Sequence, residues 1–178
     1  MSRSVFFLFL MASIFMIKCT VEGPVPTVKE FTNKLLINGV EDEIKIAEME
    51  HFPKLPANKN YNIELRFYSG TTEASYKPTR SYSGVGSFFD FFLWSQDSTL
   101  ASGTYKIDGF VNQDFSISKA TGYLNVDWDT GESDFGSRLD GFIEVENLGT
   151  GKYKININCT DYEGSSVAAF YEGEFYQL

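Results

Sequence analysis

The sequence predicts an all-β domain, built as an antiparallel meander of about eight or nine strands. Three observations support this prediction. Apolar and polar residues alternate in segments such as Tyr61 to Tyr68, which is the pattern of a strand with one buried face. Turn residues, above all Asn38-Gly39, separate such segments at short intervals. From residue 33 onward, no segment has the 3.6-residue period of a helix.

The predicted strands follow one another along most of the chain. They cover residues 34–37, 43–49, 61–68, 87–94, 103–108, 123–128, 141–146, 152–159 and 167–176, and the Ser-, Thr- and Gly-rich stretch 69–87 is expected to be irregular. The short links favour antiparallel pairing, because a parallel crossover needs a dozen or more residues. A long sheet loses its exposed edges by closing, so we expect a calycin-like or lipocalin-like barrel. A two-sheet β-sandwich is the second choice.

The N-terminus has the pattern of an export signal. Arg3 precedes an uncharged, largely apolar run from Val5 to Ile17, which is shorter than the roughly 20 residues that span a bilayer. Residues 1–18 are therefore interpreted as a signal peptide. Cys19 follows at the position of the acylated cysteine of bacterial lipoproteins, although Lys18 stands where that motif has a small residue. Secretion with cleavage near Cys19 is the alternative.

The residues after the leader divide into a tether and one domain. Residues 19–32 begin with the cysteine predicted to carry lipid and continue with Gly23, Pro24 and Pro26, which is typical of a short extended linker. Residues 33–178 form the predicted single β domain. The expected location is the outer membrane or cell surface, with a secreted or periplasmic protein as the alternative.

Charge and cysteine content narrow the classes of partner. The chain has 24 acidic and 15 basic residues, a formal net charge of −9, which argues against binding nucleic acid or anionic lipid directly. Two cysteines do not make a disulfide framework. Cys159 shares a strand face with Ile155 and Ile157, so we expect it to be a small buried apolar residue.

No pattern of residues predicts catalysis or a cofactor. His51 is the single histidine, which disfavours a Ser-His-Asp triad or a zinc site, and no pair of carboxylates stands out for glycoside hydrolysis. Asp127, Asp129 and Asp134 lie in one acidic loop and are a weak candidate for Ca²⁺, with a solvated turn as the favoured alternative. We therefore expect a protein that is not an enzyme.

Aromatic residues supply the candidate ligand site. The chain has 17 Phe, 10 Tyr and 2 Trp, and most of these must pack in the core. On the segment 87–94, however, Phe88, Phe92 and Trp94 lie on the face opposite Phe89, Phe91 and Leu93. One set needs a second apolar environment, so Phe88, Phe92 and Trp94 are candidate ligand-binding residues. Packing under the 69–87 segment is the alternative.

The chain also resembles a family, through punctuation of its strands and turns. The relevant segments are Asn33 to Gly39, Phe92 to Tyr105, Gly141 to Val145, Gly151 to Ile155, Cys159 to Gly164 and Tyr171 to Gly173. They resemble uncharacterised secreted or surface lipoproteins of Bacteroidetes-type bacteria that end in an antiparallel β domain. This resemblance implies a surface or outer-membrane location and supplies no catalytic residues.

Two functions follow as expectations. The first is a membrane-anchored, non-catalytic surface module that binds a small apolar or glycan ligand. The second is a structural or interaction protein of the cell envelope that has no ligand pocket and packs against a protein partner. An aromatic cavity inside the domain would favour the first, and a filled interior with an exposed apolar patch would favour the second.

Overall fold

The computed structural model describes residues 33–178, and these residues form strands and no helix. The strands are β1 (Lys34–Ile37), β2 (Val40–His51), β3 (Tyr61–Ser69), β4 (Glu73–Ser75), β5 (Ser81–Ser83), β6 (Val85–Ser95), β7 (Gly103–Ile107), β8 (Ser116–Asp127), β9 (Phe135–Gly149), β10 (Lys152–Asp161), β11 (Ser166–Glu174) and β12 (Tyr176–Gln177). The predicted all-β class is confirmed. No helix within this range is long and apolar enough to cross a membrane.

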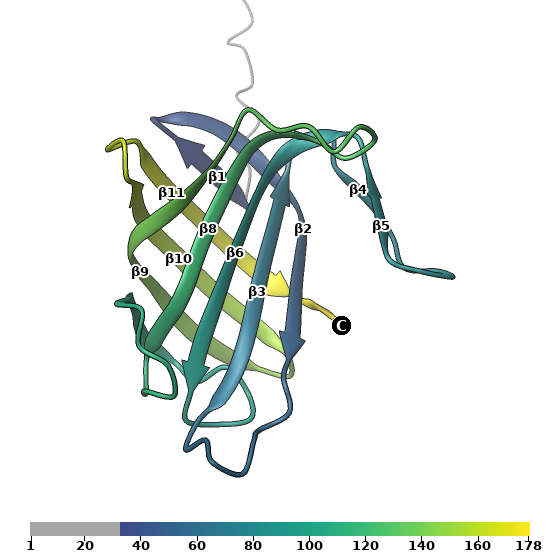
Figure 1. The fold of residues 1–178 in the computed structure, drawn as a ribbon. Coiled ribbons are helices and arrows are strands. Elements are labelled where there is room, and N and C mark those ends of the chain that lie inside the picture. The colour runs from purple at the N-terminus through teal and green to yellow at the C-terminus, as the bar shows by residue number, and fades with distance from the viewer. Residues whose placement is uncertain (1–32) are drawn as a thin grey trace, which may run out of the picture. The chain divides into compact units, whose positions relative to one another are not determined.

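The main sheet closes into a barrel (Figure 1). Its strands pair in the order β1-β11-β10-β9-β7-β8-β6-β3-β2, and β1 also pairs with β2. Lys34 of β1 lies opposite Phe170 of β11 on one side and opposite Glu43 of β2 on the other. The four residues of β1 therefore close the ring, and the barrel is confirmed over the sandwich.

The turn between β1 and β2 is the predicted Asn-Gly hairpin. Asn38 and Gly39 both have positive φ, at 51° and 79°. Such a turn matches the twist of the flanking strands and requires residues that tolerate the left-handed region. The Asn38 side chain also accepts a hydrogen bond from the backbone N–H of Ser166 at 3.0 Å. This hairpin is thereby tied to the start of β11.

Two short parallel pairings depart from the predicted antiparallel meander. Lys106 and Ile107 of β7 lie alongside Ser116 and Ile117 of β8, and β12 runs parallel to Glu48 and Met49 near the C-terminal end of β2. The rule about long crossovers applies to full strands. Here β7 and β8 are parallel over two residue pairs only, and the loop 108–115 is long enough to connect them without a helix.

Two segments contain more strand than the sequence indicates. The stretch 69–87 was expected to be irregular, but β4 and β5 pair in a small hairpin within it, and β6 starts at Val85. Strands β8 and β9 extend well before the predicted 123–128 and 141–146. These additions are rich in Ser, Thr, Gly and Lys, which hide the alternation, and their pairing depends on neighbours distant in sequence.

The interior of the barrel is filled by side chains from all its walls. Phe67, near the middle of β3, makes edge contacts with Phe91, Tyr171 and Phe175 at ring-centroid distances of 5.6 to 6.4 Å. The buried cluster also includes Met49, Ile63, Leu65, Phe89, Leu93, Leu100, Tyr105, Ile117, Leu139, Ile143, Tyr153 and Ile155. Between Ile37, Phe89 and Val167 the open space is about 20 Å³, which is close to one water molecule.

Candidate functional site

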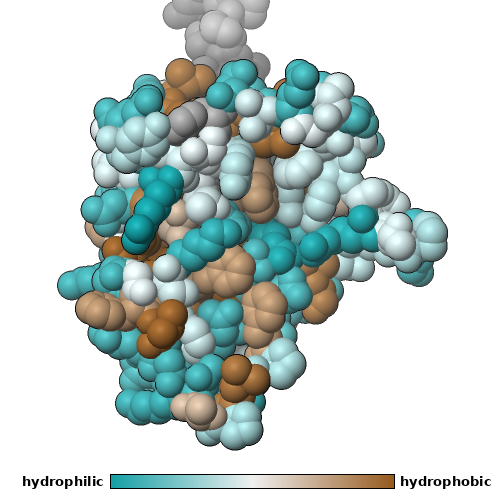
Figure 2. Space-filling view, viewed as in Figure 1, coloured by the Kyte–Doolittle hydropathy of each residue, from teal (hydrophilic) through white to brown (hydrophobic). Residues whose placement is uncertain are grey.

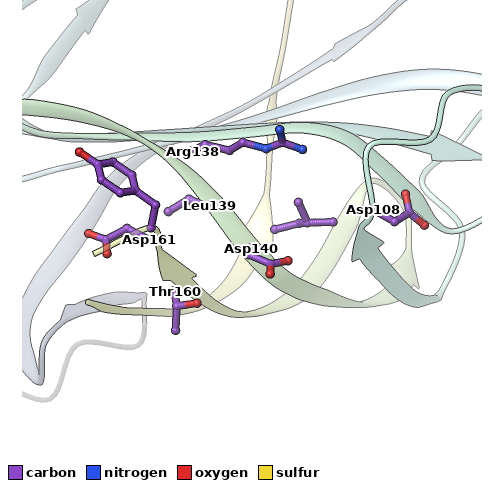
Figure 3. A pocket seen from close by; sticks show the side chains of 8 residues that line it. Asp108, Arg138, Leu139, Asp140, Thr160 and Asp161 are labelled. Atoms are coloured by element: carbon purple, nitrogen blue, oxygen red, sulfur yellow. The ribbon is translucent and has the colours of Figure 1, made fainter. Parts of the chain in front are cut away.

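The strongest candidate site is a depression on the barrel wall, where β7 ends beside β9 and β10. Its volume is about 380 Å³, and it is lined by Ile107, Asp108, Arg138, Leu139, Asp140, Thr160, Asp161 and Tyr162. We call it the acidic depression. Figure 3 shows Asp108 and Asp161 toward opposite ends, with Arg138 on one side and Asp140 and Thr160 on the other.

The alternation of the strands explains how these polar side chains come together. On β9, Leu139 is buried in the core while Arg138 and Asp140 are exposed. Asp140 is the register partner of Thr160 on β10. The β7–β9 register places Lys106 opposite Phe142, so the chain after β7 runs on toward Asp140. Residues of β9 and β10 and the residue after β7 thus supply one polar surface.

Each carboxylate of the depression is fixed through one oxygen. Oδ1 of Asp108 accepts hydrogen bonds from the Ser116 hydroxyl and, at 3.0 Å, from the N–H of Phe110. Oδ1 of Asp140 accepts from the N–H of Gly141 at 2.9 Å.

Asp161 is held in the same way. Its Oδ1 accepts from the N–H groups of Glu163 and Ser165, at 2.9 and 2.8 Å. Within residues 33–178, the Oδ2 atoms of Asp108, Asp140 and Asp161 make no hydrogen bond. The depression therefore holds three oriented acceptors that the protein itself does not use.

Arg138 and Tyr162 complete the acidic depression. The guanidinium of Arg138 makes no hydrogen bond or ion pair within the described range. Tyr162 lines the depression and is 67% exposed. Desolvation and the nearby carboxylates of Glu163 and Asp161 raise the pKa of Tyr162, so its hydroxyl stays neutral. The site offers charged acceptors, one planar donor and one aromatic ring.

The depression does not have the arrangement of a metal centre. Among residues 33–178, no group of three or more His, Cys, Asp or Glu side chains is placed to hold a metal ion. The three unused aspartate oxygens suit a ligand that donates several hydrogen bonds. Sequence reasoning did not select these residues, because they come from three separate segments near β7, β9 and β10, and no short motif links them.

The aromatic residues selected from the sequence lie on the outer face of β6. Phe89, Phe91 and Leu93 face the interior and are buried in its core. Phe88, Phe92 and Trp94 point the other way, and none of them lines the acidic depression. Each of the three contacts different neighbours, so they do not form one pocket.

Each of the three has its own surroundings. Phe88 packs with Tyr68 and Trp128 at ring-centroid distances of 4.9 and 5.8 Å, next to the β4–β5 hairpin. Phe92 stacks with Phe52 of the β2–β3 loop at 6.1 Å. Trp94 is 9% exposed, and its indole N–H has no hydrogen-bond partner within the described residues. Their proposed role in binding stays a prediction.

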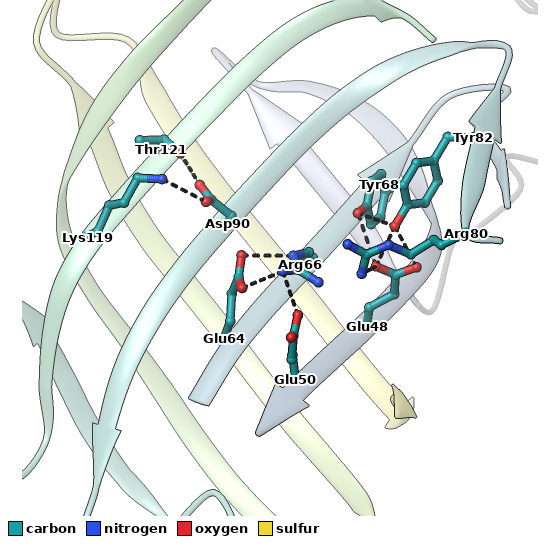
Figure 4. A network of polar contacts seen from close by, with 10 residues as sticks. All are labelled: Glu48, Glu50, Glu64, Arg66, Tyr68, Arg80, Tyr82, Asp90, Lys119 and Thr121. Atoms are coloured by element: carbon teal, nitrogen blue, oxygen red, sulfur yellow. Dashed lines mark hydrogen bonds and ion pairs between the residues drawn. The ribbon is translucent and has the colours of Figure 1, made fainter. Parts of the chain in front are cut away.

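Beneath the β4–β5 hairpin, a buried carboxylate on the outer face of the barrel accepts hydrogen bonds from several tyrosines (Figure 4). Glu48 of β2 is 0% exposed. Its oxygens accept hydrogen bonds from Tyr82 at 2.8 and 2.9 Å, Tyr76 at 2.9 Å and Tyr68 at 3.1 Å. Arg80 lies 3.9 Å away. We call Glu48 and these four residues the Glu48 cluster.

A row of ion pairs runs beside this cluster on the same face. Arg66 donates to Glu64 and Glu50 at 2.8 Å each, and Lys119 lies 3.3 Å from Asp90. Burial raises the pKa of Glu64, which the hydrogen bonds and charge of Arg66 oppose. Hydrophilic residues cross the face formed by β3, β6 and β8 among hydrophobic ones (Figure 2). Each of these charges is paired with another on the outer face of the barrel.

The candidate calcium residues do not gather around one point. Asp127 accepts the N–H groups of Asp129 and Thr130, as in a local turn. Asp129 accepts from the N–H of Gly84, and Asp134 accepts from the side chain of Asn125. The three carboxylates thus serve three different local contacts. Weak binding of Ca²⁺ stays a prediction without a preformed cluster to support it.

The two cysteines and the histidine have separate outcomes. Cys19 lies outside the described residues. Cys159 is buried and free, as expected, and burial raises the pKa of its thiol to about 12. His51 is exposed at the end of β2.

No protein-family model matches the chain, and no curated protein or solved structure was found to be similar to it.

Proposed function

We propose that this protein is a non-catalytic surface module that binds a glycan in the acidic depression. The observation that carries the proposal is the set of three aspartates held through Oδ1 with Oδ2 unused. Sugar hydroxyls are donors with close spacing, and charge-assisted hydrogen bonds to carboxylates are the stronger kind. Tyr162, which is 67% exposed, adds an aromatic side chain to the lining of the depression.

A glycan is favoured over the other expected ligand, a small apolar molecule. An apolar ligand of ordinary size needs a cavity of about 300 Å³ or more with largely hydrophobic walls. The barrel interior is filled, and the space near its rim between Ile37, Phe89 and Val167 is about 20 Å³. The acidic depression has the needed volume, but its walls are mostly polar. Its chemistry therefore suits a hydroxyl-rich ligand.

The proposal includes export and anchoring. The uncharged run from Val5 to Ile17 behind Arg3, the position of Cys19 and the proline-containing segment after it support a lipid-anchored protein of the outer membrane or cell surface. Mass spectrometry of the mature N-terminus tests this part. A diacylated Cys19 is the expected result, and an unmodified terminus at another residue would contradict it.

The binding proposal is tested by a glycan screen followed by calorimetry on two matched variants. Asp140→Asn neutralises a carboxylate of the depression and keeps its shape. Glu146→Gln neutralises an exposed carboxylate on the same strand, away from the site. We expect Asp140→Asn to weaken binding about ten-fold and Glu146→Gln to leave it unchanged. A screen without any glycan bound, or equal losses in the two variants, would refute the proposal.

A second candidate function is docking to an envelope protein. Phe110 and Val111 are 58% and 68% exposed side by side on the loop 108–115. The neighbouring β2–β3 loop is joined to this one by a 2.8 Å hydrogen bond from the N–H of Asn60 to Asn112, and it exposes Leu55. A Phe110→Ser, Val111→Ser variant should lose crosslinks to envelope proteins in cells and retain glycan binding. Unchanged crosslinking would remove this candidate.

A further inference from the structure

A second depression lies on the other side of Arg138, over the outer face of β8. It is lined by Gly109, Ser118, Lys119, Ala120, Thr121 and Arg138, and its volume is about 360 Å³. We call it the basic depression. It contains two cations and no acidic side chain, whereas the acidic depression contains three aspartates and one cation. Because Arg138 belongs to both, the two form adjoining parts of one surface.

The side chain of Arg138 is available to a ligand, because no other side chain of residues 33–178 pairs with it. It is the register partner of Thr121 on β8, and a side chain added at Gly109 would approach its Nη2 within 3.6 Å. The other two arginines of residues 33–178, Arg66 and Arg80, both form ion pairs. Arg138 forms none, although three aspartates line the same depression. Its five N–H donors are therefore left for a bound group.

Lys119 supplies a second positive charge in a fixed position. Its Nζ lies 3.3 Å from Asp90 Oδ2 and 5.1 Å from the ring centroid of Phe92. The side chain is still 55% exposed, and an ammonium group has three donors, so this contact leaves donors for a ligand. The contacts to Asp90 and Phe92 restrain where the charge lies before a ligand arrives.

From this placement we infer that the glycan is acidic and spans both depressions. A sugar unit carrying a carboxylate, that is a uronic acid, occupies the basic depression between Lys119 and Arg138. The planar guanidinium of Arg138 matches a carboxylate with two parallel hydrogen bonds. An adjoining unit presents its hydroxyls to the aspartates of the acidic depression, which would repel a second carboxylate. This inference rests on the proposed function and adds the charge and the orientation of the ligand.

The first test compares acidic and neutral forms of one saccharide on the full-length protein. The probes are an aldobiouronic acid, which joins one uronic acid to one neutral sugar, and its methyl ester, in which the single carboxyl group carries no charge. We expect the acid to bind at least about ten-fold more tightly, and the preference to shrink as salt rises from about 0.05 to 0.5 M. Equal binding of the two, or tighter binding of the ester, overturns the inference and leaves a neutral-glycan function standing.

The second test uses charge variants at the basic depression. Arg138→Gln and Lys119→Gln should each remove most of the preference for the acid over the ester. Lys152→Gln removes a lysine at the opposite end of β10, where it pairs with Glu174, and should leave the preference unchanged. Thermal melting checks that Arg138→Gln stays folded, as expected for a side chain without a protein partner. A full preference in both site variants overturns the inference.

Discussion

The inside of the barrel and its outer face beneath the β4–β5 hairpin are both packed with aromatic rings, but they are stabilised differently. Inside, Phe67 contacts three rings, and none of these contacts involves a charge. Outside, Tyr68 and Tyr82 of the Glu48 cluster pack with each other, and Trp128 packs on Tyr68. The carboxylate of Glu48 at the centre of the cluster is 0% exposed. The two regions use opposite faces of the same strands, β2 and β3.

The difference shows what each kind of packing determines. Apolar burial is proportional to area and has no direction, so the interior fixes the volume of the barrel. A buried carboxylate is tolerated only when donors satisfy it, and those donors must come from defined positions. Tyr76 and Tyr82 reach Glu48 only if the hairpin lies in one orientation. The Glu48 cluster therefore positions the hairpin.

The largest effect is expected inside the barrel. Phe67→Ala should lower the free energy of unfolding by about 3–5 kcal/mol, because it removes a buried ring and leaves a cavity among its neighbours. Urea unfolding followed by tryptophan fluorescence measures this loss. Phe110→Ala, at a 58% exposed position, serves as the control and should change stability by about 0.5 kcal/mol or less. A loss below about 1.5 kcal/mol at Phe67 would mean that the interior is loosely packed.

A smaller loss is expected at the centre of the outer cluster. Glu48→Ala should destabilise the protein by about 2–3 kcal/mol, because three tyrosine hydroxyls lose a charged acceptor. Glu48→Gln keeps the size of the side chain and should recover part of that loss. Limited proteolysis should then cut within residues 76–80 of the hairpin before the barrel unfolds. Intact hairpins in Glu48→Ala would contradict the role of this carboxylate.

Alkaline pH should weaken both regions. Burial, with the hydrogen bond and charge of Glu48, raises the pKa of Tyr82 to about 12, and the hydroxyl of Tyr68 opposes that rise. Burial also raises the pKa of Tyr105 inside the barrel to about 12. An unfolded tyrosine ionises near pH 10, so these contributions are complete below about pH 10 and are lost as pH rises toward 12.

The measurement is the free energy of unfolding between pH 8 and pH 12. Each such tyrosine adds a slope of at most about 1.4 kcal/mol per pH unit above pH 10. Tyr82→Phe should flatten the profile by removing an ionisable group of the Glu48 cluster, and Tyr105→Phe should flatten it by removing one in the interior. A profile that is level up to pH 12 would show that neither hydroxyl is protected.

The smallest effect is expected where the C-terminal strand touches the hairpin. Tyr176 of β12 stacks on Tyr76 with ring centroids 3.7 Å apart, while the Tyr76 hydroxyl donates to Glu48. Tyr176→Ala should cost about 0.5–1.5 kcal/mol, because the partly exposed stack contributes modestly. Thermal melting detects it, and Tyr176→Phe should restore most of the stability. If Tyr176→Phe costs as much as Tyr176→Ala, the stack is not the cause.

Much of the fold could be predicted from local pattern. The period-two alternation of Tyr61 to Tyr68 and the positive-φ turn at Asn38-Gly39 correspond to β3 and the first hairpin. The hairpin of β4 and β5 could not be predicted, because its stability depends on Glu48, which is distant in sequence. The first half of β8 could not be predicted either, because it depends on contacts with the distant strand β6. Gly122 of β8, for example, lies under the ring of Phe89.

The candidate site was less predictable than the fold. The sequence pointed to the aromatic face of β6, and its opposition to the face of Phe89 was read correctly. The acidic depression was missed, since Asp108, Asp140 and Asp161 come from three separate segments and carry no common motif. One signal was present for two of them: Asp108 follows an alternating strand and Asp161 ends one. That signal is too common in a chain with 24 acidic residues to select a site.

The sequence by itself determined the strands with clear alternation, where the first tight turn lies and which side chains share a face. These properties depend on neighbours along the chain, through alternation and turn chemistry. Only the tertiary structure decided which face points inward, how four residues of β1 close the barrel, and which polar groups meet beside Arg138. Those outcomes depend on strand register between distant segments, because register sets the neighbours of every outward side chain.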